Sequence, residues 1–443
     1  MSSFRKARKE LRAGYARVDI TPPVGGEMSG FFARQQPSIG IHDRLFARAV
    51  VLESDEVRIG IVSCDLLGFH PDFDAELRDA ISRATGISGE GLMIACTHTH
   101  SGAACYPLRG CGRMDVRWMR ELRRRLVRVA ARAARKLHPV TARFGRDQAD
   151  LARVRWLRST ARPNALRRIH PRHPEVSVIQ FRRGQRPFLS VLHYACHPVV
   201  LGPENRRISA DYPGAATAFL EEATGAPALF LNGASGNLNP KIAHQRPDAE
   251  GFRRLREIGE TLGKSALRAI RDGRPLPETD LWARIEWVEA PLRRPSTNEL
   301  RRTIARDRLA LKRGGESPLR QAMRAAFLAW ARESLRELAS RKAPRVAKVS
   351  LQQMRLGPLL LVALGGEPYE ALGARLQRRG GRPCLVVGYA NGNLGYLPSR
   401  EAFRYGGYEI EDAHKFYGRF GVGPSVEKRL ASRLVRRRRR AWA

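Results

Sequence analysis

The stretch LMIACTHTHSG, residues 92–102, joins an apolar run to two histidines that are separated by one threonine. The run from Leu92 to Ala95 is typical of a buried strand. Side chains two residues apart in an extended chain point to the same face, so we expect His98 and His100 to project together from the strand's end. Two imidazoles placed in this way suit a metal ligand beside an acid/base group, or two polar side chains that meet solvent.

Strand-like and helix-like segments alternate on both sides of this stretch. Strands are predicted at residues 58–67, 92–95, 189–195, 228–231, 359–364 and 385–389, and helices at 72–85, 115–137, 211–224 and 253–271. This alternation predicts an α/β fold of layered mixed sheets flanked by helices, with the functional residues at strand ends.

Two further helices, between Ser296 and Ala339, interrupt the alternation. Ser296 with Glu299 forms a capping-box pattern, and Ser317 before Pro318 is typical of a helix start. Four apolar residues at helical spacing predict a face that packs on neighbouring structure: Leu319, Met323, Phe327 and Trp330. We expect one domain over residues 13–430 with this helical excursion at about 296–340, followed by a basic tail at 431–443.

The chain is strongly basic, because 80 lysines and arginines outnumber 43 acidic residues and give a net charge of +37. The excess is almost all arginine, it is spread along the predicted helices, and no nucleic-acid-binding motif accompanies it. We therefore expect no specific nucleic-acid partner and only a weak attraction to anionic surfaces such as membranes. The dense block Arg436 to Arg440 predicts a mobile arm.

The apolar runs, the first twelve residues and the cysteines of the chain indicate where in the cell we expect the protein. No apolar run approaches the roughly 20 residues of a membrane span, and residues 1–12 are polar and basic, unlike a secretory signal. The six cysteines are dispersed and do not resemble a disulfide framework. A cytoplasmic protein with free thiols is the prediction.

Polar residues recur where the predicted strands end. His98 and His100 end one strand, His197 another, and Glu367 follows a third, while a fourth leads towards Tyr396. Such ends converge on one crevice in an open α/β sheet, and two imidazoles, a carboxylate and an oxygen donor there suit zinc with an open position for water. Taken singly, His197 could be structural and Glu367 could cap a helix.

A series of dispersed motifs then becomes informative through its order along the chain: GYARVDITPPVG (14–25), GIHDRLFARAVVL (40–52), THTHSG (97–102), HYACHPVVLG (193–202), SADYPG (209–214), LNGASGNLNP (231–240), GGEPYEALG (365–373) and GYLPSREAF (395–403). In these motifs the chain resembles the catalytic domain of the neutral, non-lysosomal ceramidases, from about Ala13 to Gly423. The resemblance implies an α/β catalytic domain that contains zinc.

The resemblance also implies roles for individual residues. The zinc ligands of the family fall on His98, His197, Glu367 and Tyr396. The pocket is lined by His100, Asp211 and Asn239, which would act in catalysis together with Tyr396. The implied activity is hydrolysis of a carbon–nitrogen amide bond, in which zinc-activated water attacks an N-acyl carbonyl. The implied substrate is a small N-acyl compound, with ceramide as the family's own, which would place the protein in sphingolipid metabolism.

One loop departs from the family's pattern and leaves alternatives open. Neutral ceramidases carry an aspartate and a serine in this loop, and here Asn237 and Asn239 stand in their places, with Ser235 upstream. Water activated by zinc needs no serine, so hydrolysis remains the prediction, but specificity for ceramide does not follow. The alternatives are a zinc hydrolase of a non-lipid N-acyl or ester substrate, and a non-catalytic basic relative that binds anionic surfaces.

Overall fold

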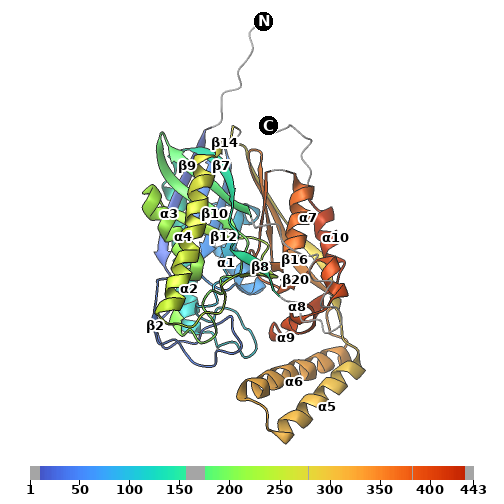
Figure 1. Cartoon of the computed structure of the whole chain (residues 1–443). Helices are drawn as coiled ribbons and strands as arrows, with labels where there is room; N and C mark the ends of the chain where they lie inside the picture. Colours follow the sequence, from blue (N-terminus) through green and yellow to red (C-terminus); the bar gives the residue numbers. More distant parts are fainter. Residues whose placement is uncertain (1–9, 156–174, 278, 382, 435–443) are drawn as a thin grey trace.

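The computed structural model of the chain describes residues 10–155, 175–277, 279–381 and 383–434, and three five-stranded sheets form its centre (Figure 1). The first sheet has the order β5 (Leu92–Cys96), β4 (Val57–Cys64), β3 (Phe46–Ser54), β1 (Leu11–Asp19) and β6 (His138–Pro139). The second has the order β12 (Ala228–Asn232), β10 (Arg186–Tyr194), β9 (Glu175–Arg183), β7 (Thr141–Gln148) and β14 (Arg274–Pro275). The third has the order β19 (Cys384–Val387), β17 (Leu359–Leu364), β16 (Val346–Leu356), β15 (Leu281–Arg293) and β21 (Gly421–Val422).

Each sheet begins with one parallel pair of strands and continues with antiparallel pairs. The parallel pairs are β4 with β5, β10 with β12, and β17 with β19. Loops between the sheets join these pairs, since Cys96 N donates to Tyr389 O and Gly388 N donates to Asn232 O. The carboxyl ends of β5, β10, β17 and β19 are therefore brought to one region, as the sequence predicts.

Apolar side chains from all three sheets share one core. Ile61 of the first sheet, Val191 of the second and Leu361 of the third belong to the same cluster of buried residues. Several of these strands, β3 among them, are buried on both faces, because helices cover their other side. Burial of this area supplies most of the free energy that holds the sheets together.

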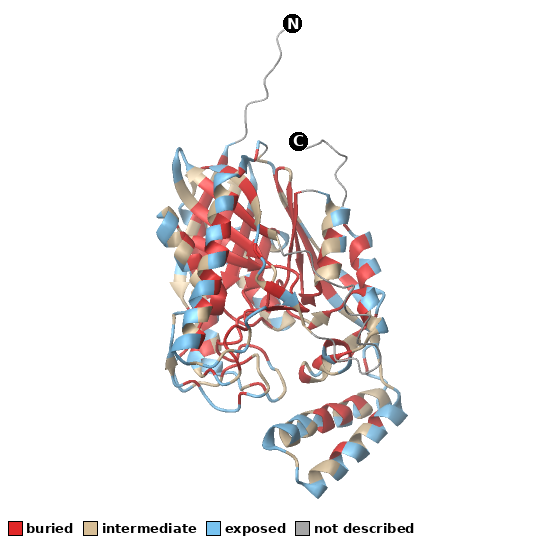
Figure 2. Ribbon diagram, in the orientation of Figure 1, coloured by how far each residue is buried: buried red, intermediate tan, exposed pale blue. Residues whose placement is uncertain are grey.

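Helices cover the outer face of each sheet (Figure 1), and they are buried on one side only (Figure 2). The first sheet carries α1 (Pro71–Thr85) and α2 (Val116–Arg135), the second α3 (Asp211–Thr224) and α4 (Ala249–Arg271), and the third α7 (Glu370–Gly380) and α10 (Val426–Ser432). In α2 the side chain of Asp115 caps the helix through the amides of Arg117 and Trp118. The apolar residues Leu122 and Leu126 then recur at helical spacing and face the sheet.

Short elements carry the loops of the functional region: β2 (Gly40–Ile41), β8 (Ala152–Val154), β11 (Arg207–Ile208), β13 (Leu238–Pro240), β18 (Glu367–Pro368), β20 (Tyr396–Leu397), α8 (Tyr408–Glu411), α9 (Ala413–Phe416) and the 3-10 turns Gly89–Gly91 and Arg400–Arg404. They form three two-stranded pairs, β11 with β2, β13 with β8 and β18 with β20.

The α/β fold of mixed sheets flanked by helices is confirmed, and the structure matches every predicted strand and helix in place. The helical excursion consists of α5 (Thr297–Arg313) and α6 (Pro318–Ala339), with the predicted capping box at Ser296 and the predicted cap at Ser317. The prediction for the apolar face of α6 is wrong in part. Phe327 and Trp330 are buried, but Leu319 and Met323 are exposed because no described element covers them.

Three further predictions concern the cysteines, membrane spans and the basic arm. All six cysteines are buried free thiols. Among the helices of the described residues, none has the length and apolarity needed to cross a membrane. The predicted mobile arm, Arg436 to Arg440, lies outside the described residues.

Candidate functional site

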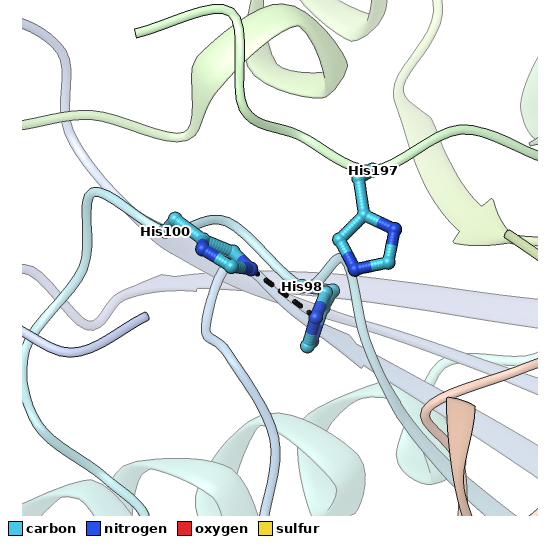
Figure 3. Close-up of side chains that lie close together, drawn as sticks. All are labelled: His98, His100 and His197. Carbon is cyan, nitrogen blue, oxygen red and sulfur yellow. Dashed lines mark hydrogen bonds between the residues drawn. The ribbon is translucent and has the colours of Figure 1, made fainter. Parts of the chain in front are cut away.

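Three histidines from two sheets lie together (Figure 3). His98 and His100 follow β5 of the first sheet, and His197 follows β10 of the second. Each offers a ring nitrogen, and these atoms lie within 4.8 Å of one another. The Nε2 atoms of His98 and His100 are 3.3 Å apart. The three imidazoles thus form a cluster that could hold a metal ion.

His98 and His100 meet for a different reason from the one predicted. The strand β5 ends at Cys96, and His98 has a φ of 72°, in the left-handed region that a non-glycine residue rarely adopts. The chain is therefore turned rather than extended at this residue. The turn is fixed by the amide of His98, which donates to Leu66 O at 2.9 Å. Such a backbone conformation is typical of functional sites, where the surrounding structure holds it.

Backbone carbonyls orient two of the imidazoles. The Nδ1 atom of His98 lies 2.6 Å from Leu67 O, and the Nδ1 atom of His197 lies 2.7 Å from Ser235 O. A carbonyl oxygen can only accept, so in each ring Nδ1 carries the proton and Nε2 keeps its lone pair. A backbone carbonyl on Nδ1 is a usual partner for histidines that bind a metal through Nε2.

Glu367 of β18 completes the arrangement from the third sheet's side. Its Oε2 atom lies 3.4 Å from Nε2 of His98 and 3.4 Å from Nε2 of His197. Its other oxygen, Oε1, accepts a hydrogen bond from the hydroxyl of Tyr417. Within the described residues neither Glu367 Oε2 nor His197 Nε2 has a hydrogen-bond partner, although both are buried.

The protonation states suit a cation in this position. Burial and, to a smaller extent, the charge of Arg155 lower the pKa of His197 to about 3, so this imidazole is neutral at pH 7. Burial also lowers the pKa of His100 well below its usual value, with His98 adding to the effect. Burial opposes ionisation of Glu367, but His98 and His197 outweigh it and hold the pKa of this carboxyl well below its usual range.

Tyr396 lies beside Glu367, because β20 pairs with β18 in parallel and places these two residues opposite each other. The Tyr396 hydroxyl accepts a hydrogen bond from Nη2 of Arg155 at 3.1 Å, and the guanidinium lies 5.4 Å from the centre of the tyrosine ring. Arg155 also pairs with Glu409 at 3.1 Å. Burial raises the pKa of Tyr396 well above its usual value, while Arg155 works against this rise.

The carboxylate of Asp211 is occupied by the backbone. It accepts hydrogen bonds from the amides of Tyr212 (2.7 Å), Leu201 (3.1 Å) and Val200 (3.3 Å). These contacts anchor the segment that follows His197, and Asp211 is not part of the histidine cluster. Burial raises the pKa of Asp211 to about 6.

The loop between β12 and β13 carries the residues that replace the family's aspartate and serine. The Asn237 side chain accepts from the amide of Glu370 at 2.8 Å, so it ties this loop to the start of α7. Asn239 lies in β13, is nearly buried, and its Oδ1 atom has no partner in the described part of the chain. A Cβ atom on Gly236 would lie only 2.4 Å from Glu367 O, so glycine is needed where the loop passes the glutamate.

Ser235 is no free nucleophile. Its side chain is fully buried, and its hydroxyl donates to Asn232 Oδ1 at 3.1 Å and lies 2.8 Å from the hydroxyl of Tyr389. The Tyr389 ring also stacks on His98, with the ring centres 4.0 Å apart. The serine therefore belongs to the network that positions His98 and His197.

Three residues of the site escaped the sequence analysis: Arg155, Tyr389 and Tyr417. Tyr389 ends a predicted strand, and its position at a strand end is the signal that the sequence gives for it. Arg155 and Tyr417 give no signal, because each is a common residue in a loop whose partner is distant in the sequence.

The donor atoms fit a divalent ion, zinc in particular. One carboxylate oxygen and two imidazole nitrogens, each ring held at its other nitrogen by a backbone carbonyl, form a frequent set of zinc ligands. The resemblance adds Tyr396, which lies opposite Glu367 in the strand pair of β18 and β20, as a further oxygen ligand. The metal itself and the roles of single residues remain predictions.

Comparison with known proteins places this geometry in a family. The family of neutral/alkaline non-lysosomal ceramidases, N-terminal part, matches residues 11–235, which is more than half of the chain. A neutral ceramidase from Pseudomonas aeruginosa is 25% identical over 484 aligned residues, which cover 92% of this chain and 69% of that protein.

Solved structures agree in fold. The crystal structure of neutral ceramidase from Pseudomonas aeruginosa superposes with a TM-score of 0.72 at 21% identity, over 96% of this chain and 73% of that one. A structure of ceramidase complexed with C2 gives a TM-score of 0.73 at 20% identity, over 96% and 74% of the two chains. The chain therefore belongs to the neutral/alkaline non-lysosomal ceramidase family.

Proposed function

We propose that this protein is a zinc-dependent hydrolase that cleaves the amide bond of N-acylated lipids of the ceramide class. The observation that carries the proposal is the convergence of His98 Nε2, His197 Nε2 and Glu367 Oε2 at the ends of strands from three sheets. Membership of the ceramidase family supports the substrate class. Residues 13–430 would act as one catalytic domain.

His98, His197 and Glu367 would hold the ion, with Tyr396 as a further oxygen ligand. When bound, zinc supplies a Lewis acid and lowers the pKa of water at its open position. The bonds from Nδ1 of His98 to Leu67 O and from Nδ1 of His197 to Ser235 O leave the lone pair of each ring on Nε2, the atom that would bind the ion.

The remaining residues would handle protons and the carbonyl oxygen. Hydrolysis of an amide needs a proton taken from water and a proton given to the leaving nitrogen. His100 is suited to this transfer, since it donates from Nε2 to Nε2 of His98, while its buried Nδ1 has no partner in the described residues and can accept a proton. The hydroxyl of Tyr396, which Arg155 positions, would leave the ion to stabilise the negative charge that develops on the carbonyl oxygen, and the amide N–H of Asn239 would donate to the same oxygen.

The test is a substrate screen with metal-loaded protein. N-acyl sphingosines, N-acyl amino acids and N-acetyl sugars are offered separately, and release of the free amine is measured. We expect turnover of N-acyl sphingosines and its loss in the presence of a chelator. Turnover of another class alone would assign the site to a different N-acyl substrate, and turnover that survives complete removal of metal would overturn the zinc mechanism.

A further inference from the structure

The hairpin of α5 and α6 stands out from the body of the protein, below α9 in Figure 1. Its base is firmly attached. Trp330 donates from Nε1 to Arg419 O at 3.0 Å, and the ring of Phe327 lies 5.2 Å from that of Phe416. The next residue, Tyr417, donates to Glu367. The hairpin is thus built onto the segment that borders the candidate site.

The far half of the hairpin exposes three large apolar side chains around its turn. Leu309 near the end of α5 is 48% exposed, and Leu319 and Met323 at the start of α6 are 43% and 37% exposed. They lie on either side of the turn at Gly314 and Gly315, in which both glycines have positive φ. Apolar residues that gather on one projecting element mark a surface for a partner rather than for water.

The charges around these apolar residues have one sign. Six exposed cationic side chains form no ion pair with any described residue: Arg301, Arg302, Arg308, Lys312, Arg313 and Arg320. The acidic residues of α5 and of the turn are already engaged, while Glu333 of α6 pairs with Arg109 and Glu337 lies near the end of α6, away from the turn. Glu299 belongs to the capping box, Asp307 pairs with Arg306 and Arg324, and Glu316 pairs with Arg324. The free charge of the hairpin is therefore positive.

We propose that the tip of this hairpin, defined by Leu309, Leu319 and Met323 with the surrounding cations, docks on an anionic lipid bilayer. Apolar side chains that enter the interface and cations that meet acidic head groups are the two elements of reversible membrane binding. The inference rests on the proposed function in that a lipid amide is delivered from such a surface. The inference adds the part of the protein, the tip of the hairpin, at which the enzyme would meet the membrane that carries its substrate.

Flotation with lipid vesicles tests the proposal without reference to activity. The full chain is mixed with vesicles of phosphatidylcholine alone or with phosphatidylglycerol added, and the partition coefficient is measured. One variant removes the apolar contacts (Leu309→Ser, Leu319→Ser, Met323→Ser), and a second reverses the charge (Lys312→Glu, Arg313→Glu, Arg320→Glu). Matched controls lie elsewhere: Val57→Ser at the start of β4, and Arg183→Glu with Arg186→Glu at the turn between β9 and β10.

We expect wild-type protein to bind only the anionic vesicles, and each tip variant to lose at least about ten-fold in partition coefficient. Both controls should stay within about two-fold of wild type. Thermal melting of every variant excludes misfolding as the cause. The proposal would be overturned if wild-type protein did not bind anionic vesicles, or if the tip variants bound them as well as the controls do. Binding of the wild-type protein to a DNA duplex but not to vesicles would also overturn it. Docking without turnover of any N-acyl sphingosine would uphold the surface and overturn the proposed activity.

Discussion

The Oε2 atom of Glu367 lies 3.4 Å from the Nε2 atom of His197, and both atoms are buried without a hydrogen-bond partner in the described residues. Each such group costs free energy in a folded protein unless something satisfies it. The two residues come from different sheets and are held from behind by Tyr417 and by Ser235 O. A divalent cation between them would remove the penalty for both.

Removal of either histidine should therefore remove the metal. Purified wild-type protein should contain about one zinc per chain, and His98→Ala or His197→Ala should contain almost none, because each loses one of a small set of ligands. Elemental analysis by mass spectrometry measures this. His138→Ala, on β6, is the matched control and should keep its zinc. Full metal content in both site variants would show that the assignment is wrong.

His100 is expected to act on protons rather than on the metal. His100→Gln should keep bound zinc and lower turnover by about 10²–10⁴-fold, the usual contribution of a general acid or base. Metal content and turnover of the same preparation are compared. Loss of zinc from this variant would instead make His100 a third histidine ligand, which the cluster's geometry also allows.

Tyr396 and Arg155 should act together. Tyr396→Phe removes the hydroxyl but keeps the ring, and we expect turnover to fall by about 10²–10³-fold with a stable fold, as for the loss of one oxyanion donor. Arg155→Lys should show a smaller fall, since lysine keeps the charge but cannot keep both the bond to Tyr396 and the ion pair with Glu409. Near-normal turnover of Tyr396→Phe would remove this tyrosine from the mechanism.

Asp211 should make stability depend on pH. Burial raises its pKa to about 6 in the folded protein, against roughly 4 in an unfolded chain. Between these values the folded state binds the extra proton, so the contribution of this group is complete below pH 4 and is lost as the pH rises through 6. For metal-free protein, the stability advantage of wild type over Asp211→Asn should shrink by about 3 kcal/mol over this range.

Urea unfolding at pH 4 to 7 measures this difference. Asp248→Asn, a change at the exposed N-cap of α4, is the control and should show no such narrowing over the same range. A constant difference between wild type and Asp211→Asn would mean that the carboxylate stays ionised through its bonds to the amides of Val200 and Leu201.

The predictable parts of this protein are those with local signals. The helix predicted at 211–224 has the bounds of α3, since the signals of a helix lie within its own segment. Strands β3 and β16 are not predicted, since Arg48 and Gln352 interrupt their apolar runs and are buried only through bonds to Asp65 and to Glu90 O and Leu92 O. The left-handed turn at His98 and the bond from Arg155 to Tyr396 depend on tertiary contacts, which no window of sequence contains.

Asn239, which stands where the family has a serine, decides between two mechanisms. Its nearly buried side chain lies in β13, just after Gly236, whose backbone passes Glu367, and its amide N–H groups can donate to a carbonyl oxygen. Asparagine cannot form an acyl-enzyme, and the Ser235 hydroxyl is fully buried and bound to Asn232 and Tyr389. We therefore expect Asn239→Ala to lower turnover by about 10²–10³-fold with unchanged zinc, while the exposed Asn298→Ala on α5 leaves it unaffected. Unchanged turnover in Asn239→Ala would show that this residue has no role in catalysis and only forms part of a turn before Pro240. Burst kinetics with an acyl adduct on Ser235, detected by mass spectrometry of the quenched enzyme, would overturn direct attack by water altogether.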